Sequence, residues 1–186
     1  MMEALVTVMI VFVCLDFVVR LTFLRPAYML ATAFACALFT GLMCPVAAEQ
    51  TTTALSGFIS DRTLMLDTAV LLSVDILSGI TFCWLSVMKM DGNIGGLRQK
   101  MLLCFTAYFP GTTVFLVLFY FLLKTVFSFH GVPFALLGWG LAAAVMAAIP
   151  LLVFIVRRII PRDRGRLDLL FMAYVLTAMA GAMVTV

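Results

Sequence analysis

The sequence predicts an all-helical protein that crosses a membrane about six times, and three observations predict it. Hydrophobic residues make up 65% of the 186 residues, while charged residues make up only 11%. A soluble domain of this length could not cover its surface with so few polar groups. The apolar residues form about six stretches, each near the ~20 residues that a helix needs to cross a bilayer. None of them alternates like a strand.

The six predicted helices follow one another with short connections, so residues 1–186 are expected to form a single membrane domain. Their ranges are 1–19, 27–48, 63–88, 101–123, 132–156 and 167–186. The most polar connection, residues 49–62, is predicted to be external and partly interfacial. No soluble domain is expected.

The basic residues orient this bundle. Ten of the twelve follow the first, third and fifth stretches, and the other connections hold only Arg62 and Lys124. Connections rich in Lys and Arg stay in the cytoplasm, so both termini are predicted to lie outside. The connection before the sixth helix is also expected to contact anionic lipids or an acidic partner through Arg157, Arg158, Arg162, Arg164 and Arg166.

The first helix carries a pair of opposite charges. Asp16 precedes Arg20 by four residues, a spacing that places both side chains on one helix face. We expect an interfacial ion pair that fixes the depth of the helix.

Small residues recur at intervals of four on three helices. Such faces allow membrane helices to approach one another closely. They predict a compact bundle, a homo-oligomer or association with other membrane subunits. The residues are Ala33, Ala37 and Gly41 on the second helix, Gly140, Ala144 and Ala148 on the fifth, and Ala173, Thr177 and Gly181 on the sixth.

Prolines interrupt two of the helices. Pro110 and Gly111 stand near the middle of the fourth helix, and Pro150 stands inside the fifth. Proline removes a backbone donor and often kinks a membrane helix. Broken helices form substrate sites in transporters, but kinks that serve only packing are commoner, and both interpretations stay open.

The third helix contains the run LMLDTAVLLSVDIL, residues 64–77, with two aspartates. A charged aspartate at the bilayer centre costs about 2.5–3.5 kcal/mol on insertion scales. At ~1.5 Å per residue, Asp67 lies about 6 Å from the outer end of the helix and Asp75 about 18 Å from it. Asp75 is therefore predicted to lie close to the membrane midplane.

No basic residue is expected at the depth of Asp75, so its carboxyl is predicted to be neutral at rest, because burial disfavours the charged form. Such a carboxyl suits an ion or proton pathway, contact with a transported solute, or a bond between subunits. Asp67 and Ser78 are the other predicted members of this pathway. The structural alternative is a neutral Asp75 that bonds to a hydroxyl or to a backbone carbonyl.

Catalysis is not expected. The single histidine, His130, falls in an outer connection, and neither H-E-x-x-H nor G-x-S-x-G is present. We therefore expect no catalytic residue, no metal and no cofactor. No basic face supports binding of nucleic acid. The partners expected are membrane lipids and other membrane helices.

The run FISDRTLMLDTAVLLSVDI, residues 58–76, resembles the small multi-span inner-membrane proteins of Bacteroidetes-type haem-utilisation loci. Those proteins accompany a proton-channel subunit of the ExbB/TolQ type and a cobaltochelatase-like protein. The resemblance implies a non-enzymatic subunit of an ion-powered transport assembly in the bacterial inner membrane that serves haem or iron acquisition.

Two other functions are consistent with the sequence. Six helices in a chain this short also resemble the substrate-binding membrane subunits of energy-coupling-factor vitamin transporters. In that case Asp67 and residues 49–62 would lie near a pocket at the outer face. The third possibility is a structural membrane scaffold.

Overall fold

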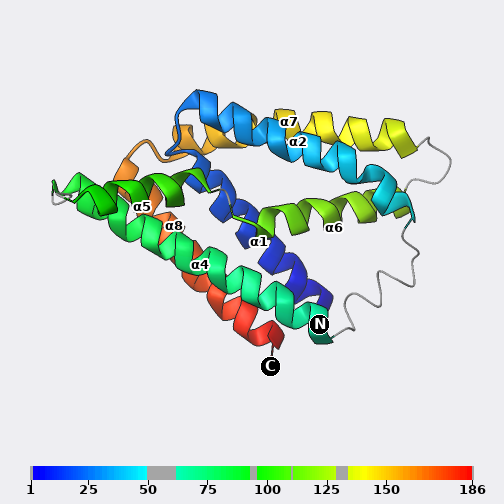
Figure 1. Cartoon of the computed structure of the whole chain (residues 1–186), viewed down its shortest axis with the longest axis horizontal. Coiled ribbons are helices and arrows are strands. Elements are labelled where there is room, and N and C mark those ends of the chain that lie inside the picture. The colour runs from blue at the N-terminus through cyan, green and yellow to red at the C-terminus, as the bar shows by residue number, and fades with distance from the viewer. Residues whose placement is uncertain (1, 50–61, 93–95, 110, 129–133, 186) are drawn as a thin grey trace.

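The structure is a computed structural model that describes residues 2–49, 62–92, 96–109, 111–128 and 134–185 (Figure 1). Every element of regular structure within these residues is a helix. The helices are α1 (Met2–Leu21), α2 (Pro26–Glu49), α4 (Arg62–Met90), α5 (Leu97–Tyr108), α6 (Thr113–Ser128), α7 (Phe134–Ile159) and α8 (Asp163–Thr185). The predicted external connection, residues 49–62, lies outside the described residues except at its two ends. His130 also lies outside the described residues.

Four helices of the described chain are long and apolar enough to cross a membrane. The spans are Pro26–Ala47, Asp67–Met90, Leu136–Ile159 and Asp163–Ala182. Large apolar side chains point outward from them, among them Trp84, Phe154 and Met172, each more than 60% exposed. A surface of this kind suits lipid and not water. The predicted all-helical fold is confirmed for the described residues, and the four long apolar helices are consistent with a membrane protein.

The fourth predicted helix is two helices. α5 has 12 residues and α6 has 16, so each is shorter than the ~20 residues of a full span. Between them Gly111 adopts a φ of +90°, in the left-handed region that glycine occupies without strain. The described residues therefore form seven helices where the sequence predicted six, and six crossings of the membrane stay a prediction. α7, in contrast, continues through Pro150.

α1 lies at the centre of the bundle. Figure 1 shows it between the pair formed by α2 and α7 and the pair formed by α4 and α8. α8 packs against both α1 and α4, and α6 packs against α2, α7 and α1. Every side chain from Asp16 to Thr22 is buried. The most buried segment of the first helix thus contains the charged residues Asp16 and Arg20.

Two of the three predicted small-residue faces pack inside the chain. A Cβ added to Gly41 of α2 would lie 3.2 Å from the Trp139 side chain of α7. A Cβ on Gly181 of α8 would lie 2.9 Å from Leu72 of α4. Both faces therefore hold the monomer together. Their buried members are Ala33, Ala37, Gly41, Ala173 and Thr177.

The third face lies on the surface. Gly140, Ala144 and Ala148 of α7 are all exposed, and a Cβ on Gly140 would meet no atom within 4 Å. This face serves no packing within the described chain. An interface with another helix stays a prediction for it.

The two ends of the bundle differ in charge. α1 begins and α8 ends at the same end of the bundle, and the connections after α1, α4 and α7 lie at the opposite end (Figure 1). At that opposite end, Arg164 of α8 pairs with Asp91, directly after α4, at 3.1 Å. The connections that hold most of the basic residues are therefore gathered on one side.

Candidate functional site

The break between α5 and α6 places two helix ends inside the bundle. A helix leaves carbonyls unpaired at its C-terminus and N–H groups unpaired at its N-terminus, with partial negative and positive charge respectively. The structure sets an opposite charge against each end. Arg20 of α1 contacts the end of α5, and Asp75 of α4 contacts the start of α6.

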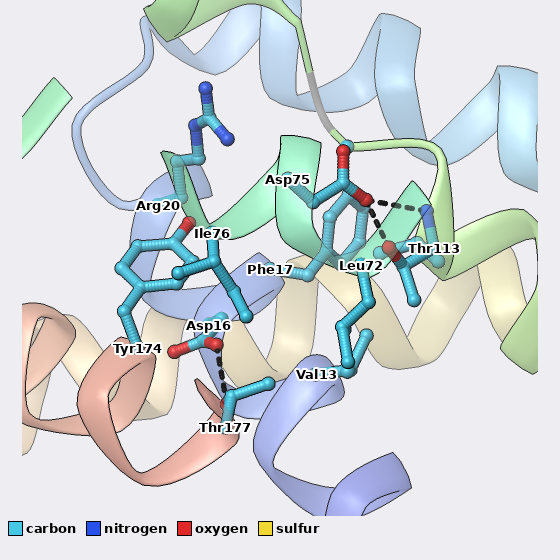
Figure 2. A pocket seen from close by; sticks show the side chains of 12 residues that line it. Val13, Asp16, Phe17, Arg20, Leu72, Asp75, Ile76, Thr113, Tyr174 and Thr177 are labelled. Atoms are coloured by element: carbon cyan, nitrogen blue, oxygen red, sulfur yellow. Dashed lines mark hydrogen bonds between the residues drawn. The ribbon is translucent and has the colours of Figure 1, made fainter. Parts of the chain in front are cut away.

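Asp75 is held by the first residues of α6. It is only 8% exposed. Its Oδ1 accepts hydrogen bonds from the Thr112 N–H at 3.1 Å and the Thr112 hydroxyl at 3.3 Å. Its Oδ2 accepts from the Thr113 N–H at 2.7 Å and from the Thr113 hydroxyl (Figure 2). Both carboxylate oxygens thus cap the N-terminus of α6.

Gly111 is what allows this close approach. A Cβ at that position would lie 3.3 Å from Oδ2 of Asp75, and its φ of +90° is unfavourable for residues with a side chain. Glycine is therefore required here both by the backbone and by the carboxylate next to it.

These contacts correct one prediction about Asp75. Arg20 lines the same cavity as Asp75, so a basic residue does lie at its depth. Two backbone N–H groups and two hydroxyls are directed at the two carboxylate oxygens. Bonding to a hydroxyl was foreseen in the structural alternative. Bonding to backbone N–H groups was not.

Arg20 is held by the last turn of α5. It is only 3% exposed and donates hydrogen bonds to the carbonyl oxygen of Thr106 and, at 3.3 Å, to the hydroxyl of Ser78. Its guanidinium carbon lies 5.5 Å from the centre of the Phe82 ring. A cation is stabilised both at a helix C-terminus and over an aromatic face. Ser78, predicted with Asp75, is thus a partner of Arg20.

Asp16 is the third buried charged residue, at 5% exposure. Its Oδ2 accepts a hydrogen bond at 3.1 Å from the Thr177 hydroxyl of α8, which also lies 2.8 Å from the Ala173 carbonyl oxygen. Its Oδ1 has no partner among the described residues. The predicted ion pair with Arg20 is wrong. Arg20 reaches to α5 while Asp16 reaches to α8, with the ring of Tyr174 between their charged groups in Figure 2. The interfacial position of the two residues stays a prediction.

All three charged residues line one small cavity, of about 30 Å³ (Figure 2). A water needs roughly 10–15 Å³ by this measure, so the cavity has room for about two. Pockets for organic ligands are on the order of 300–1,000 Å³. The cavity thus suits water or a small ion. Its lining residues are Val13, Asp16, Phe17, Arg20, Leu72, Asp75, Ile76, Gly111, Thr113, Val114, Tyr174 and Thr177.

Asp67 is not part of this site. It is exposed on the first turns of α4 and does not line the cavity. Metal ligands do not gather here either, because no group of three or more His, Cys, Asp or Glu side chains occurs among the described residues.

Two of the five arginines predicted to contact lipid or a partner are used inside the fold. Arg157 of α7 donates to the carbonyl of Thr22 at 2.8 and 3.2 Å and to that of Leu24 at 2.9 Å. It therefore satisfies backbone carbonyls of the turn that directly follows α1. Arg166 is buried, pairs with Asp163 and lies 5.3 Å from the Phe23 ring centre. Arg166 is therefore not available to lipid or a partner, whereas such contact stays a prediction for Arg157, which is half-buried.

The other three arginines remain on the surface. Arg164 is paired with Asp91, and both side chains are largely exposed. Arg158 and Arg162 are exposed. Contact of these residues with lipid head groups stays a prediction.

Thr112 and Thr113 are the site residues that the sequence analysis missed. They directly follow Pro110 and Gly111. Threonine after a helix breaker is a helix N-cap signal, so the start of a new helix could have been found there. Tyr174 lines the cavity without any comparable local signal.

Comparisons with protein-family models, curated proteins and solved structures find no match for this chain. Its function therefore has to be derived from the site.

Proposed function

We propose that the chain is a non-enzymatic subunit of an ion-powered transport assembly in the bacterial inner membrane, and that the cavity at the broken helix lies on the path of the ion. Discontinuous helices whose ends face a central cavity form the ion and substrate sites of many transporters. Ionisable residues inside a membrane are expensive and mark ion or proton pathways. The α5–α6 break combines both features.

One observation carries the proposal. Three charged side chains, each more than nine-tenths buried, line a cavity that is large enough for water. Capping of α5 and α6 accounts for Arg20 and Asp75. It leaves Asp16, which accepts one hydrogen bond from Thr177 and whose Oδ1 has no hydrogen-bond partner among the described residues. A scaffold has no use for such a buried oxygen.

The cavity volume favours an ion over an organic solute, and thereby the ion-powered assembly over the vitamin transporter. The resemblance of residues 58–76 supplies the remainder of the proposal, a role in haem or iron acquisition. In this arrangement the membrane is crossed six times with both termini outside, and α5 and α6 together make the fourth crossing.

Ion flux tests this function. The protein, purified in mild detergent with the membrane subunits that accompany it, would be reconstituted into vesicles loaded with proton- and sodium-sensitive dyes. We expect an imposed membrane potential to drive flux well above that of empty vesicles. Asp16→Leu, at the cavity, should abolish it, and Asp67→Leu, which removes an exposed carboxyl, should not. Flux no greater than in empty vesicles would contradict the function.

A further inference from the structure

We propose that the ion taken up at this cavity is a proton, and that Asp16, and not Asp75, is the carboxyl that carries it. The inference rests on the proposed function and names its ion and its carrier. Three observations support it: Asp16 and Asp75 have different hydrogen-bond partners, the charges lining the cavity do not balance, and the hydroxyls of the cavity wall already donate to the carboxylates.

The two carboxyls differ in their hydrogen-bond partners. Asp75 accepts from two N–H groups and two hydroxyls, so both of its oxygens are committed as acceptors. Among the described residues, Asp16 accepts from Thr177 alone, and its Oδ1 is buried without a partner. A buried polar atom without a partner is unfavourable. A proton on Oδ1 turns that atom into a donor for a water in the cavity.

The charges of the cavity lead to the same residue. Asp75 and Arg20 carry opposite charges, each stabilised by a helix end, so they balance one another. An ionised Asp16 would add one uncompensated negative charge in a region of low polarity, which is strongly unfavourable. One proton on Asp16 restores neutrality. The proton passes from a hydronium to Oδ1 and leaves a water behind, and on release Oδ1–H gives it to another water.

A metal cation fits this cavity less well. Hard cations take a shell of roughly six or more oxygen ligands. The Thr113 and Thr177 hydroxyls already donate to Asp75 and Asp16, and Arg20 brings a positive charge to the same wall. Each water needs ~10–15 Å³, so the cavity holds about two waters, and two waters cannot complete the shell of oxygen ligands.

The titratable and charged groups around Asp16 come from three helices. They are Arg20 on α1, Asp75 and Cys83 on α4, and Tyr174 on α8. α6 contributes only Thr113 and Val114 to the cavity wall, and α7 contributes no residue.

Infrared difference spectroscopy of the purified protein at a series of pH values tests the inference without needing transport. A protonated carboxyl has a C=O stretch distinct from that of a carboxylate. We expect one such band from a buried carboxyl to weaken as the pH rises. Asp16→Asn should abolish it, while Asp75→Asn and the exposed control Asp67→Asn should retain it. Loss of the band in Asp75→Asn with retention in Asp16→Asn would overturn the inference.

Thr177→Val provides a second variant that keeps the carboxyl if Asp16→Asn does not fold. Valine has nearly the shape of threonine but removes the single donor to the charged form of Asp16, so the midpoint of the band should move to higher pH. An unmoved midpoint would exclude Asp16 as the origin of the band. A band that shifts when sodium replaces choline at constant pH would identify a metal cation instead.

The flux test and the infrared test can give opposite results, so failure of the transport function and failure of the proton site are distinguishable. Flux of sodium without a titrating band would leave the proposed function standing and remove the proton. A band that disappears in Asp16→Asn, in a protein that moves no ion, would leave the proton site standing and remove the transport function.

Discussion

At the residue scale, the partners of Asp75 decide what an amide substitution does there. Asn presents an oxygen on one side and an NH₂ group on the other, and Asp75 faces a backbone N–H on each side, from Thr112 and Thr113. In either orientation of the amide, its NH₂ group faces one of these two backbone N–H groups, so two donors meet. We expect Asp75→Asn to lower the free energy of unfolding by about 1–3 kcal/mol, because a buried donor loses its acceptor.

Asp16→Asn is the matched comparison. The NH₂ group can occupy the place of Oδ1, which has no partner, while the oxygen keeps the bond from Thr177. Thermal unfolding in detergent should therefore show a smaller loss for Asp16→Asn than for Asp75→Asn. Equal losses would mean that the N–H groups of α6 do not depend on Asp75.

Gly111 allows a second test at this scale. Gly111→Ala strains a residue at φ +90° and also brings a Cβ to 3.3 Å from Asp75 Oδ2. Gly92→Ala strains a residue at φ +75° with no atom within 4 Å of the Cβ. Strain of this kind costs about 1–3 kcal/mol. Both variants should unfold at lower temperature, and Gly111→Ala should lose more. The same loss in both would show that the approach of Asp75 is unimportant.

At the scale of the elements, the end of α1 depends on an arginine from α7. Arg157 bonds to the carbonyls of Thr22 and Leu24, while its neighbour Arg158 is exposed. Hydrogen bonds to charged groups contribute about 1.5–3 kcal/mol, and exposed substitutions usually change stability by less than about 0.5 kcal/mol. The unfolding temperature should be lowered by Arg157→Ala and left nearly unchanged by Arg158→Ala. Both variants remove one positive charge, so a similar effect of the two would indicate a charge effect instead.

The small-residue faces of α7 and α8 should respond differently to a large side chain. Gly181→Leu is expected to lower thermal stability, because Leu72 already occupies the space next to it. Gly140→Leu is expected to leave the monomer stable and to weaken association, because its surroundings are open. Unfolding temperature and mass in detergent measure the two effects. An unchanged mass for Gly140→Leu would show that this face contacts lipid only.

Five of the six predicted helices correspond to helices of the structure, because a long apolar run is a local property of the chain. The fourth was misjudged because apolar residues continue on both sides of Pro110 and Gly111, which makes two short helices look like one span. The charges Asp16 and Arg20 were misjudged for a different reason. Their i, i+4 spacing allows an ion pair, but the better partners lie on α8 and α5, far along the chain.

At the scale of the whole molecule, the orientation in the membrane remains to be tested. Reporter cysteines would replace Arg162, at the basic end of the bundle, and Ser128, at the end of α6, both of which are exposed. Cys14 and Cys104, the cysteines that are not buried, would first be replaced by alanine. In intact cells a membrane-impermeant reagent should label Ser128→Cys. The same reagent should label Arg162→Cys, two residues from Arg164, only after the cells are permeabilised. The reverse pattern would invert the topology.

The contact between α1 and α8 also has a consequence for the order of events during synthesis. Thr177 follows Asp16 by 161 residues, which takes about 8–30 s at roughly 5–20 residues per second on the ribosome. During this interval α1 has emerged with Asp16 and Arg20, and the helix that bonds to Asp16 does not yet exist. Because lipid solvates such a helix poorly, the insertion machinery has to retain α1 until α8 arrives. A nascent chain halted before α8 should therefore remain crosslinked to the translocon through α1, and release should coincide with the emergence of the last helix.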